Sequence, residues 1–117
     1  MSQNLSTLEK LKIASDAIKD KKGEDVRILD IRGLSVLADY FIIAHGNNVN
    51  HVQAMVDAVD EKLSKAGVEP KNVEGAKSGG WTLMDYTDFI VHVFGKQERM
   101  FYDLEKLWTD GKEVIDL

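Results

Sequence analysis

The stretch from Gly79 to Phe94 constrains the fold of this chain most, because it reads as two apolar strands joined by a short polar turn. Residues 81–84 and 89–94 are rich in β-branched and aromatic side chains, whereas residues 85–88 are polar, which is the pattern of a β-hairpin. If Thr87-Asp88 is the loop, strand alternation divides the side chains between two faces. One face has Trp81, Leu83, Asp85, Ile90, His92 and Phe94, and the other has Thr82, Met84, Tyr86, Phe89, Val91 and Val93.

The length of the hairpin loop decides whether this grouping holds. A four-residue loop would keep it, and only a loop of odd length would mix the two faces. Thr-Asp suits a type I′ turn poorly, because neither residue adopts a positive φ as readily as Asn or Gly. One face must pack on the core, and the other is either a second buried face or a binding surface.

Composition limits the classes of protein to which the chain can belong. Its 117 residues include 44% hydrophobic residues and one Pro, which predicts a single domain spanning 1–117. The net charge of −5 disfavours direct binding to nucleic acid and favours a basic protein partner. The chain has no Cys, no apolar run of membrane-spanning length and no signal-peptide layout at residue 1, so we expect a cytoplasmic protein without disulfides.

Helical periodicity predicts three helices. Ser6 and Glu9 form a capping-box pattern at the start of a helix over 7–21. A second helix follows residue 48 and ends before Gly67, and its apolar stripe contains Val49, Val52, Met55, Val56, Val59 and Leu63. The third helix spans 98–108, and a polar tail follows over 109–117.

Three strands are expected besides the hairpin. Residues 25–31 alternate in part, residues 39–44 are nearly all apolar and indicate a central strand, and residues 72–75 form a short strand. The resulting order predicts an α/β domain with a mixed sheet of four or five strands flanked by helices, and a core over about 7–108.

Carboxylates offer the main catalytic alternative. Asp85 and Asp88 lie at the hairpin tip, and Asp30 and Asp39 lie near the ends of neighbouring strands. Such a group could hold Mg²⁺ for phosphoryl or nucleotidyl transfer. The simpler interpretation, which we favour, is that these residues cap turns and strands.

Other catalytic and metal-binding patterns are missing. The histidines His45, His51 and His92 are not spaced as zinc ligands; we expect His92 to be packed or at an interface and His51 to be exposed. No serine lies in Gly-x-Ser-x-Gly and the glycines at 75–80 do not form Gly-x-Gly-x-x-Gly. We therefore expect no catalytic residue, no metal and no cofactor. Most of the aromatic residues lie in the last third of the chain, which favours a binding module over an enzyme.

Four segments resemble one known family. Residues 39–46 read Asp-Tyr-Phe-Ile-Ile-Ala-His-Gly, residues 74–75 read Glu-Gly, and the segments 81–94 and 99–108 complete the pattern. In this order and spacing they resemble the ribosomal silencing factor family, also called RsfS or Iojap. The resemblance covers about Leu8 to Trp108.

The resemblance implies a cytoplasmic bacterial factor that binds the large ribosomal subunit. The factor would dock on the ribosomal protein conventionally numbered fourteen at the intersubunit face, prevent the small subunit from joining and so lower translation. It also implies a nucleotidyltransferase-like fold without the catalytic carboxylates, and a homodimer in solution. Two alternatives stay open: a factor for assembly of the large subunit, and a Mg²⁺-dependent nucleotidyltransferase-like enzyme.

The positions that match the family's motifs are the candidate partner-binding residues. The expected contact surface is the first face of the hairpin extended by the third helix, with acidic residues meeting basic residues of the partner. The matched positions are Asp39, Tyr40, Trp81, Leu83, Asp85, Tyr86, His92, Phe94, Arg99, Tyr102, Glu105 and Trp108. The sequence departs from the family's usual residues at Thr87, where Gly is usual, at His45, where a small polar residue is usual, and at Asn48, where Ser is usual.

Overall fold

A computed structural model describes residues 5–33, 38–75, 80–102 and 112–113 of the chain. The elements are α1 (Thr7–Asp20), β1 (Glu24–Asp30), β2 (Tyr40–Gly46), α2 (Val49–Lys65), β3 (Asn72–Glu74), β4 (Trp81–Asp85), β5 (Phe89–Gly95), α3 (Lys96–Tyr102) and β6 (Lys112–Glu113). Together they form an α/β domain, as the sequence predicts.

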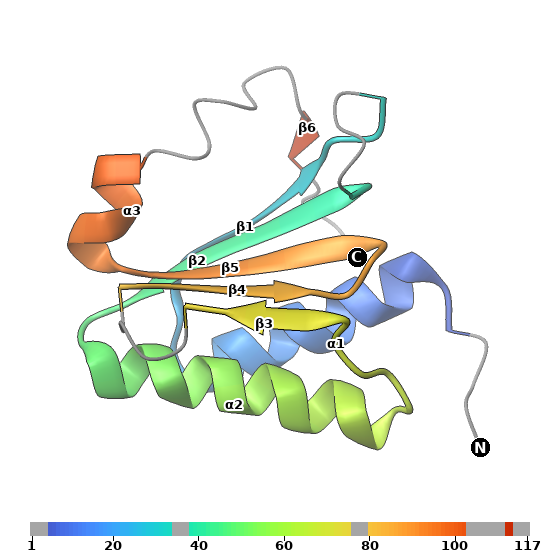
Figure 1. Cartoon of the computed structure of the whole chain (residues 1–117), viewed down its shortest axis with the longest axis horizontal. Helices are drawn as coiled ribbons and strands as arrows, with labels where there is room; N and C mark the ends of the chain where they lie inside the picture. Colours follow the sequence, from blue (N-terminus) through green and yellow to red (C-terminus); the bar gives the residue numbers. More distant parts are fainter. Residues whose placement is uncertain (1–4, 34–37, 76–79, 103–111, 114–117) are drawn as a thin grey trace.

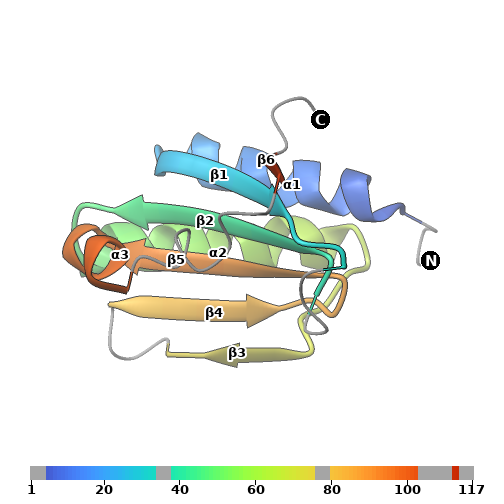
Figure 2. The same ribbon diagram turned by 90° about the horizontal axis from the view of Figure 1, so that it is seen from above.

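One mixed sheet organises the domain. Its strand order is β3-β4-β5-β2-β1-β6; β2 and β5 are parallel, and every other pair is antiparallel. The helices α1 and α2 lie side by side on one face of the sheet (Figure 1), and α3 stands on the other face, at the end where β5 finishes (Figure 2). Among the described residues, no helix combines the length and the apolarity that a membrane span requires.

Both long helices begin at the caps that their sequences provide. Ser6 Oγ accepts a hydrogen bond from Glu9 N at 3.1 Å, and Glu9 Oε1 accepts one from Ser6 N at 2.9 Å, which confirms the capping box. Asn48 caps α2, because its Oδ1 accepts a hydrogen bond from His51 N at 2.8 Å.

The hairpin has the predicted register. Trp81 pairs with Phe94, and Leu83 pairs with His92, so that Thr87-Asp88 is the loop and the two faces hold the expected residues. The turn itself is unusual, because Thr87 has a φ of 76°. Asp88 N donates to Tyr86 O at 2.9 Å, which closes a tight turn around Thr87, and Asp85 Oδ1 accepts a hydrogen bond from Thr87 N at 2.8 Å.

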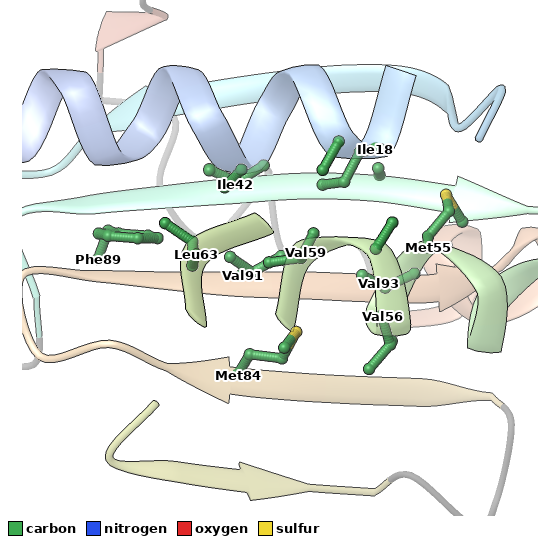
Figure 3. Packing of buried hydrophobic residues seen from close by; sticks show 14 of the residues in the cluster. Ile18, Ile42, Met55, Val56, Val59, Leu63, Met84, Phe89, Val91 and Val93 are labelled. Carbon is green, nitrogen blue, oxygen red and sulfur yellow. The ribbon is translucent and has the colours of Figure 1, made fainter. Parts of the chain in front are cut away.

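A large apolar core fills the space between the sheet and the two long helices (Figure 3). Ile42, Phe89 and Val91 point from the sheet toward the helices, and Ile18 and Leu63 meet them from α1 and α2. This arrangement confirms that the stripe on α2 faces the core. All but one of its predicted members are buried or nearly so; Val49, at the first turn, is 59% exposed.

A second apolar layer lies on the opposite face of the sheet. Ile43 and Phe94 are fully buried there, and Trp81 and Leu83 pack against the layer while staying half-buried. The central strand β2 therefore contributes alternate residues to two apolar layers, as its nearly unbroken apolar run predicts.

Two parts of the chain near its end differ from what the sequence predicts. The five longer strands form the predicted mixed sheet. The two-residue strand β6 lies in the segment expected to be a polar tail and pairs with Leu29 and Asp30 of β1, which adds a sixth strand to the sheet within the described residues. The third helix begins at Lys96 rather than at residue 98, and the part predicted over 103–108 lies outside the described residues.

Thr87→Gly should stabilise the fold. A β-branched residue at a positive φ costs about 1–3 kcal/mol, and the greater freedom of Gly in the unfolded chain offsets part of the relief, so we expect a net gain of about 1 kcal/mol in the free energy of unfolding. Urea denaturation of the two proteins measures this difference. Thr87→Val is the matched control, because it keeps the branched side chain; a gain as large as that of Gly would contradict strain at this φ.

Candidate protein-binding face of the hairpin

The candidate site is the face of the hairpin that points away from α1 and α2. We call this set the hairpin face; it consists of Trp81, Leu83 and Asp85 on β4 and of Ile90, His92 and Phe94 on β5. Burial alternates along β4, whose outward residues are half-buried while Thr82 and Met84 are buried against the helix side. The accessible part of the hairpin face is therefore the row on β4.

The indole of Trp81 is held by the residues beneath it. Its Nε1 donates a hydrogen bond to His92 Nδ1 at 3.1 Å, and its rings stack on Phe94 with a centroid separation of 5.1 Å. The imidazole of His92 in turn meets the ring of Phe41 edge-on at 4.6 Å between centroids. These contacts fix the orientation of a large, partly accessible aromatic side chain.

His92 supports this arrangement in its neutral form. The side chain is 3% exposed, and burial lowers its pKa from 6.5 to about 3. Because Nδ1 accepts the hydrogen bond from Trp81, the proton of the neutral imidazole lies on Nε2. Within the part of the chain that the structure describes, Nε2 is buried and has no hydrogen-bond partner.

Burial divides the predicted partner-binding residues into two groups. Five of them have less than a tenth of their surface exposed and are not available for direct contact in this conformation: Tyr40, Tyr86, His92, Phe94 and Arg99. Tyr40 and Tyr86 also point to the helix side of the sheet and pack in the large core, away from Trp81.

The remaining predicted residues are placed as follows. Trp81, Leu83 and Asp85 share the half-buried row on β4, and Asp39 is exposed next to the hairpin tip, where its backbone N donates to Asp88 O at 2.9 Å. The backbone of Tyr102 belongs to α3, whereas Glu105 and Trp108 lie outside the described residues.

Three of the four carboxylates considered for magnesium have local partners. Asp85 caps the turn through Thr87 N, and Asp88 Oδ2 lies 3.5 Å from Lys10 Nζ of α1. Asp30 accepts two hydrogen bonds from the guanidinium of Arg32, at 3.0 and 2.7 Å. Among the described residues there is no group of three His, Cys, Asp or Glu side chains that could hold a metal ion. These contacts fit the capping interpretation.

His51 is not the exposed residue that the sequence predicts. Its Nδ1 accepts a hydrogen bond from Asn47 N at 3.0 Å, and its Nε2 lies 2.8 Å from Lys21 O. The half-buried ring therefore joins the end of α1 to the start of α2. Residue spacing could not indicate this contact, because Lys21 and His51 are far apart in the sequence.

Phe41 is the member of the site that the sequence analysis missed. It lies on β2 beside Ile90 in the parallel pairing, and its ring supports His92. The available signal was the alternation of β2, which separates Phe41 from the side chains of Tyr40 and Ile42.

The burial of His92 predicts a loss of stability in acid that the variant His92→Phe should lack. Because its pKa is lower in the folded protein than in the unfolded chain, the unfolded chain binds the proton first, and stability falls as the pH drops below 6.5 toward 3. Between pH 7 and 4.5 this loss amounts to roughly 2–3 kcal/mol.

Urea denaturation of both proteins at the two pH values measures the effect. The absolute stability of His92→Phe also changes, because Trp81 loses its hydrogen-bond acceptor, so the quantity to compare is the change with pH. An equal change in both proteins would contradict a buried neutral imidazole.

Comparisons with known proteins identify the family of the chain. Residues 4–117 match the model of the family described as ribosomal silencing factor during starvation. The chain is 46% identical over 101 residues to the ribosomal silencing factor RsfS of Bacillus subtilis, with 86% of each chain covered. A crystal structure of a Chromobacterium violaceum protein has a TM-score of 0.88 and 36% identity, covering 97% of this chain and 94% of that one.

A more distant relative has a different name. The mouse protein called mitochondrial assembly of ribosomal large subunit protein 1 is 27% identical over 95 residues, which cover 79% of this chain and 42% of the relative. The family model matches nearly the whole chain, and the identity to the Bacillus subtilis protein extends over most of both sequences. This chain belongs to the ribosomal silencing factor family.

Proposed function

We propose that this protein binds the large ribosomal subunit through the hairpin face and prevents the small subunit from joining, so that it represses translation. The observation that carries the proposal is the row formed by Trp81, Leu83 and Asp85. The indole of Trp81 is held in place from below by His92 and Phe94. Membership of a family named for ribosomal silencing supports the ribosome as the target. The mechanism is occupancy of a surface, without turnover of a substrate.

The row on β4 has the properties of a binding centre. A Trp that is already fixed in one orientation loses little side-chain entropy on binding, and desolvated Trp residues contribute strongly to interface energies. Asp85 adds a negative charge at the edge of the same row, and the whole chain has a net charge of −5. These charges suit a basic ribosomal protein, for which they would raise the rate of association and set the orientation.

The finer details of the proposal come from the family resemblance. The partner is the ribosomal protein numbered fourteen at the intersubunit face, and the protein acts in the cytoplasm and forms homodimers in solution. The contact surface extends from the row on β4 to Asp39, Tyr102, Glu105 and Trp108. The buried candidates Tyr40, Tyr86, His92, Phe94 and Arg99 act from beneath by holding the strands and α3.

A role in assembly of the large subunit is the second candidate. The name of the mouse relative favours it, because that protein is called an assembly protein of the mitochondrial large subunit. Both functions use the same docking surface. They differ in whether mature large subunits are the target, so a joining assay with purified mature subunits separates them.

Charge changes at residue 85 should weaken binding in a graded manner. Asp85→Asn keeps an oxygen that can accept the hydrogen bond from Thr87 N but removes the charge, whereas Asp85→Lys reverses the charge. We expect co-sedimentation with large subunits to weaken by about threefold for Asn and by more than about tenfold for Lys.

The matched control is Asp57→Lys, which makes the same charge change on the exposed side of α2. It should co-sediment like the parent protein. Equal losses in Asp57→Lys and Asp85→Lys would show that net charge, rather than the hairpin face, governs binding.

Removal of the Trp81 side chain should abolish the block of subunit joining. Trp81→Ala loses the central apolar contact, and we expect binding to weaken by about thirtyfold or more, in line with a loss of at least 2 kcal/mol. The assay adds small subunits to large subunits that were incubated with each variant, and it measures the fraction of joined ribosomes after sedimentation.

Trp81→Phe is the matched control, because it keeps an aromatic ring that can stack on Phe94 but lacks the hydrogen bond to His92. It tests whether aromatic packing alone preserves binding. A folded Trp81→Ala protein that still binds large subunits and blocks joining would rule out our assignment of the site.

A further inference from the structure

The helix α3 depends on tertiary contacts for its position. Its described part, Lys96–Tyr102, has seven residues, and a helical segment of this length is not stable in isolation. Lys96 and Gln97 are exposed, and Met100 is 76% exposed, whereas Arg99 is only 6% exposed. In the part of α3 whose side chains the structure describes, Arg99 is therefore the buried contact with the sheet.

Arg99 binds to an interruption in β1. The pairing of β1 with β2 shifts register between Glu24 and Arg27, and Asp25 has a φ of 47°. Arg99 Nη1 donates to Asp25 O at 2.6 Å and to Glu24 O at 3.3 Å, and Nη2 lies 3.5 Å from Asp25 Oδ2. The bulge thus supplies carbonyl groups that the guanidinium uses to fasten α3.

The same nitrogen of Arg99 also lies 3.0 Å from Nδ1 of His45, at the end of β2. A guanidinium can only donate, so Nδ1 must be the acceptor and must have no proton. The proton of the neutral ring then lies on Nε2, which is 3.6 Å from Glu24 Oε1. The contact between α3 and β2 therefore requires neutral His45.

Protonation of His45 would oppose this contact in two ways. A proton on Nδ1 would place two donors against each other, and the imidazolium would place a second positive charge next to Arg99. Burial and the charge of Arg99 lower the pKa of His45, with a smaller contribution from Lys96; the carboxylates of Glu24 and Asp25 act in the opposite direction. Among the side chains that the structure describes on β1 and α3, these four groups are the charged neighbours that affect His45.

We infer that Arg99 and His45 form a proton-sensitive latch that positions α3 against the sheet, closed when His45 is neutral and open when it is protonated. Closed α3 binds fewer protons than open α3, so the latch weakens as the pH falls below the ordinary pKa of histidine. The equilibrium for closure decreases by up to about tenfold for each pH unit below 6.5. The inference concerns the position of α3 and does not rest on the proposed binding to the ribosome.

Hydrogen exchange measured by mass spectrometry on the full chain tests the latch. Peptides that cover residues 96–102 are compared between pH 7.5 and 5.5 after correction for the intrinsic exchange rates. In the parent protein their protection should fall by up to about tenfold over this range. Peptides from α2 report on the stability of the rest of the fold in the same samples.

Two substitutions of His45 separate the protonation effect from general acid effects. In His45→Asn, Oδ1 can take the place of Nδ1 as the acceptor and cannot be protonated in this range, so protection of α3 should not change with pH. In His45→Lys the positive charge is permanent, so α3 should be poorly protected already at pH 7.5 while α2 stays protected.

Either of two results would overturn the inference. One is an equal change with pH in the parent and in His45→Asn, including no change in both. The other is full protection of residues 96–102 in a folded His45→Lys protein. The comparison of the parent with His45→Asn remains decisive even if the Lys variant does not fold.

Discussion

The parallel pairing of β2 with β5 is the interaction on which the rest of the structure depends. Seven residues of each strand are in register, from Tyr40 beside Phe89 to Gly46 beside Gly95. Because both strands are apolar on both faces, this pair needs a cover on each side of the sheet. The helices α1 and α2 cover one side, and the second apolar layer occupies the other. The half-buried row of the hairpin face packs against this second layer, which fixes its position.

The second layer combines an energetic cost with a structural benefit. An imidazole N–H without a partner in a buried place costs about 1–3 kcal/mol, and an apolar residue at position 92 would avoid that cost. What His92 provides is an acceptor for the indole of Trp81, in the middle of a layer that otherwise consists of apolar side chains. The indole is thereby oriented before any partner arrives. A site that is ordered in advance loses less entropy on binding than one that must become ordered.

Local sequence patterns predicted the parts of the fold that depend on neighbouring residues. Alternation alone placed Trp81 and Leu83 on one face and Met84 on the other, and the spacing of Ser6 and Glu9 alone indicated the first cap. Alternation says which side of a strand a residue faces, but not how deeply the residue is covered. The complete burial of Phe94 was therefore beyond it, whereas His92 was expected to be packed or at an interface and is packed.

Contacts between distant segments were also beyond sequence reasoning. Arg99 was predicted to contact a partner, yet it binds carbonyl groups more than seventy positions earlier in the chain. The bulge that presents those carbonyl groups has no local signature, because Glu24 and Asp25 are ordinary surface residues in composition. The strand β6 was not predicted for a similar reason. Its two charged residues lie in a polar segment without a strand pattern, and they form a strand only because they pair with the edge of β1.

The strand order has a consequence for how the chain reaches its folded state during synthesis. The strands β2 and β4 are not neighbours; β5 lies between them, although it comes after both in the sequence. Until the ribosome has released residue 95, both β2 and β4 present an unpaired edge, and the apolar residues of β2 lack their main partner. Nascent chains that already include β4 but end before residue 95 therefore carry two exposed strand edges at once, which is the condition under which partly made sheets associate with one another. A protein whose family is named for ribosomes thus completes its own sheet late in its passage through one.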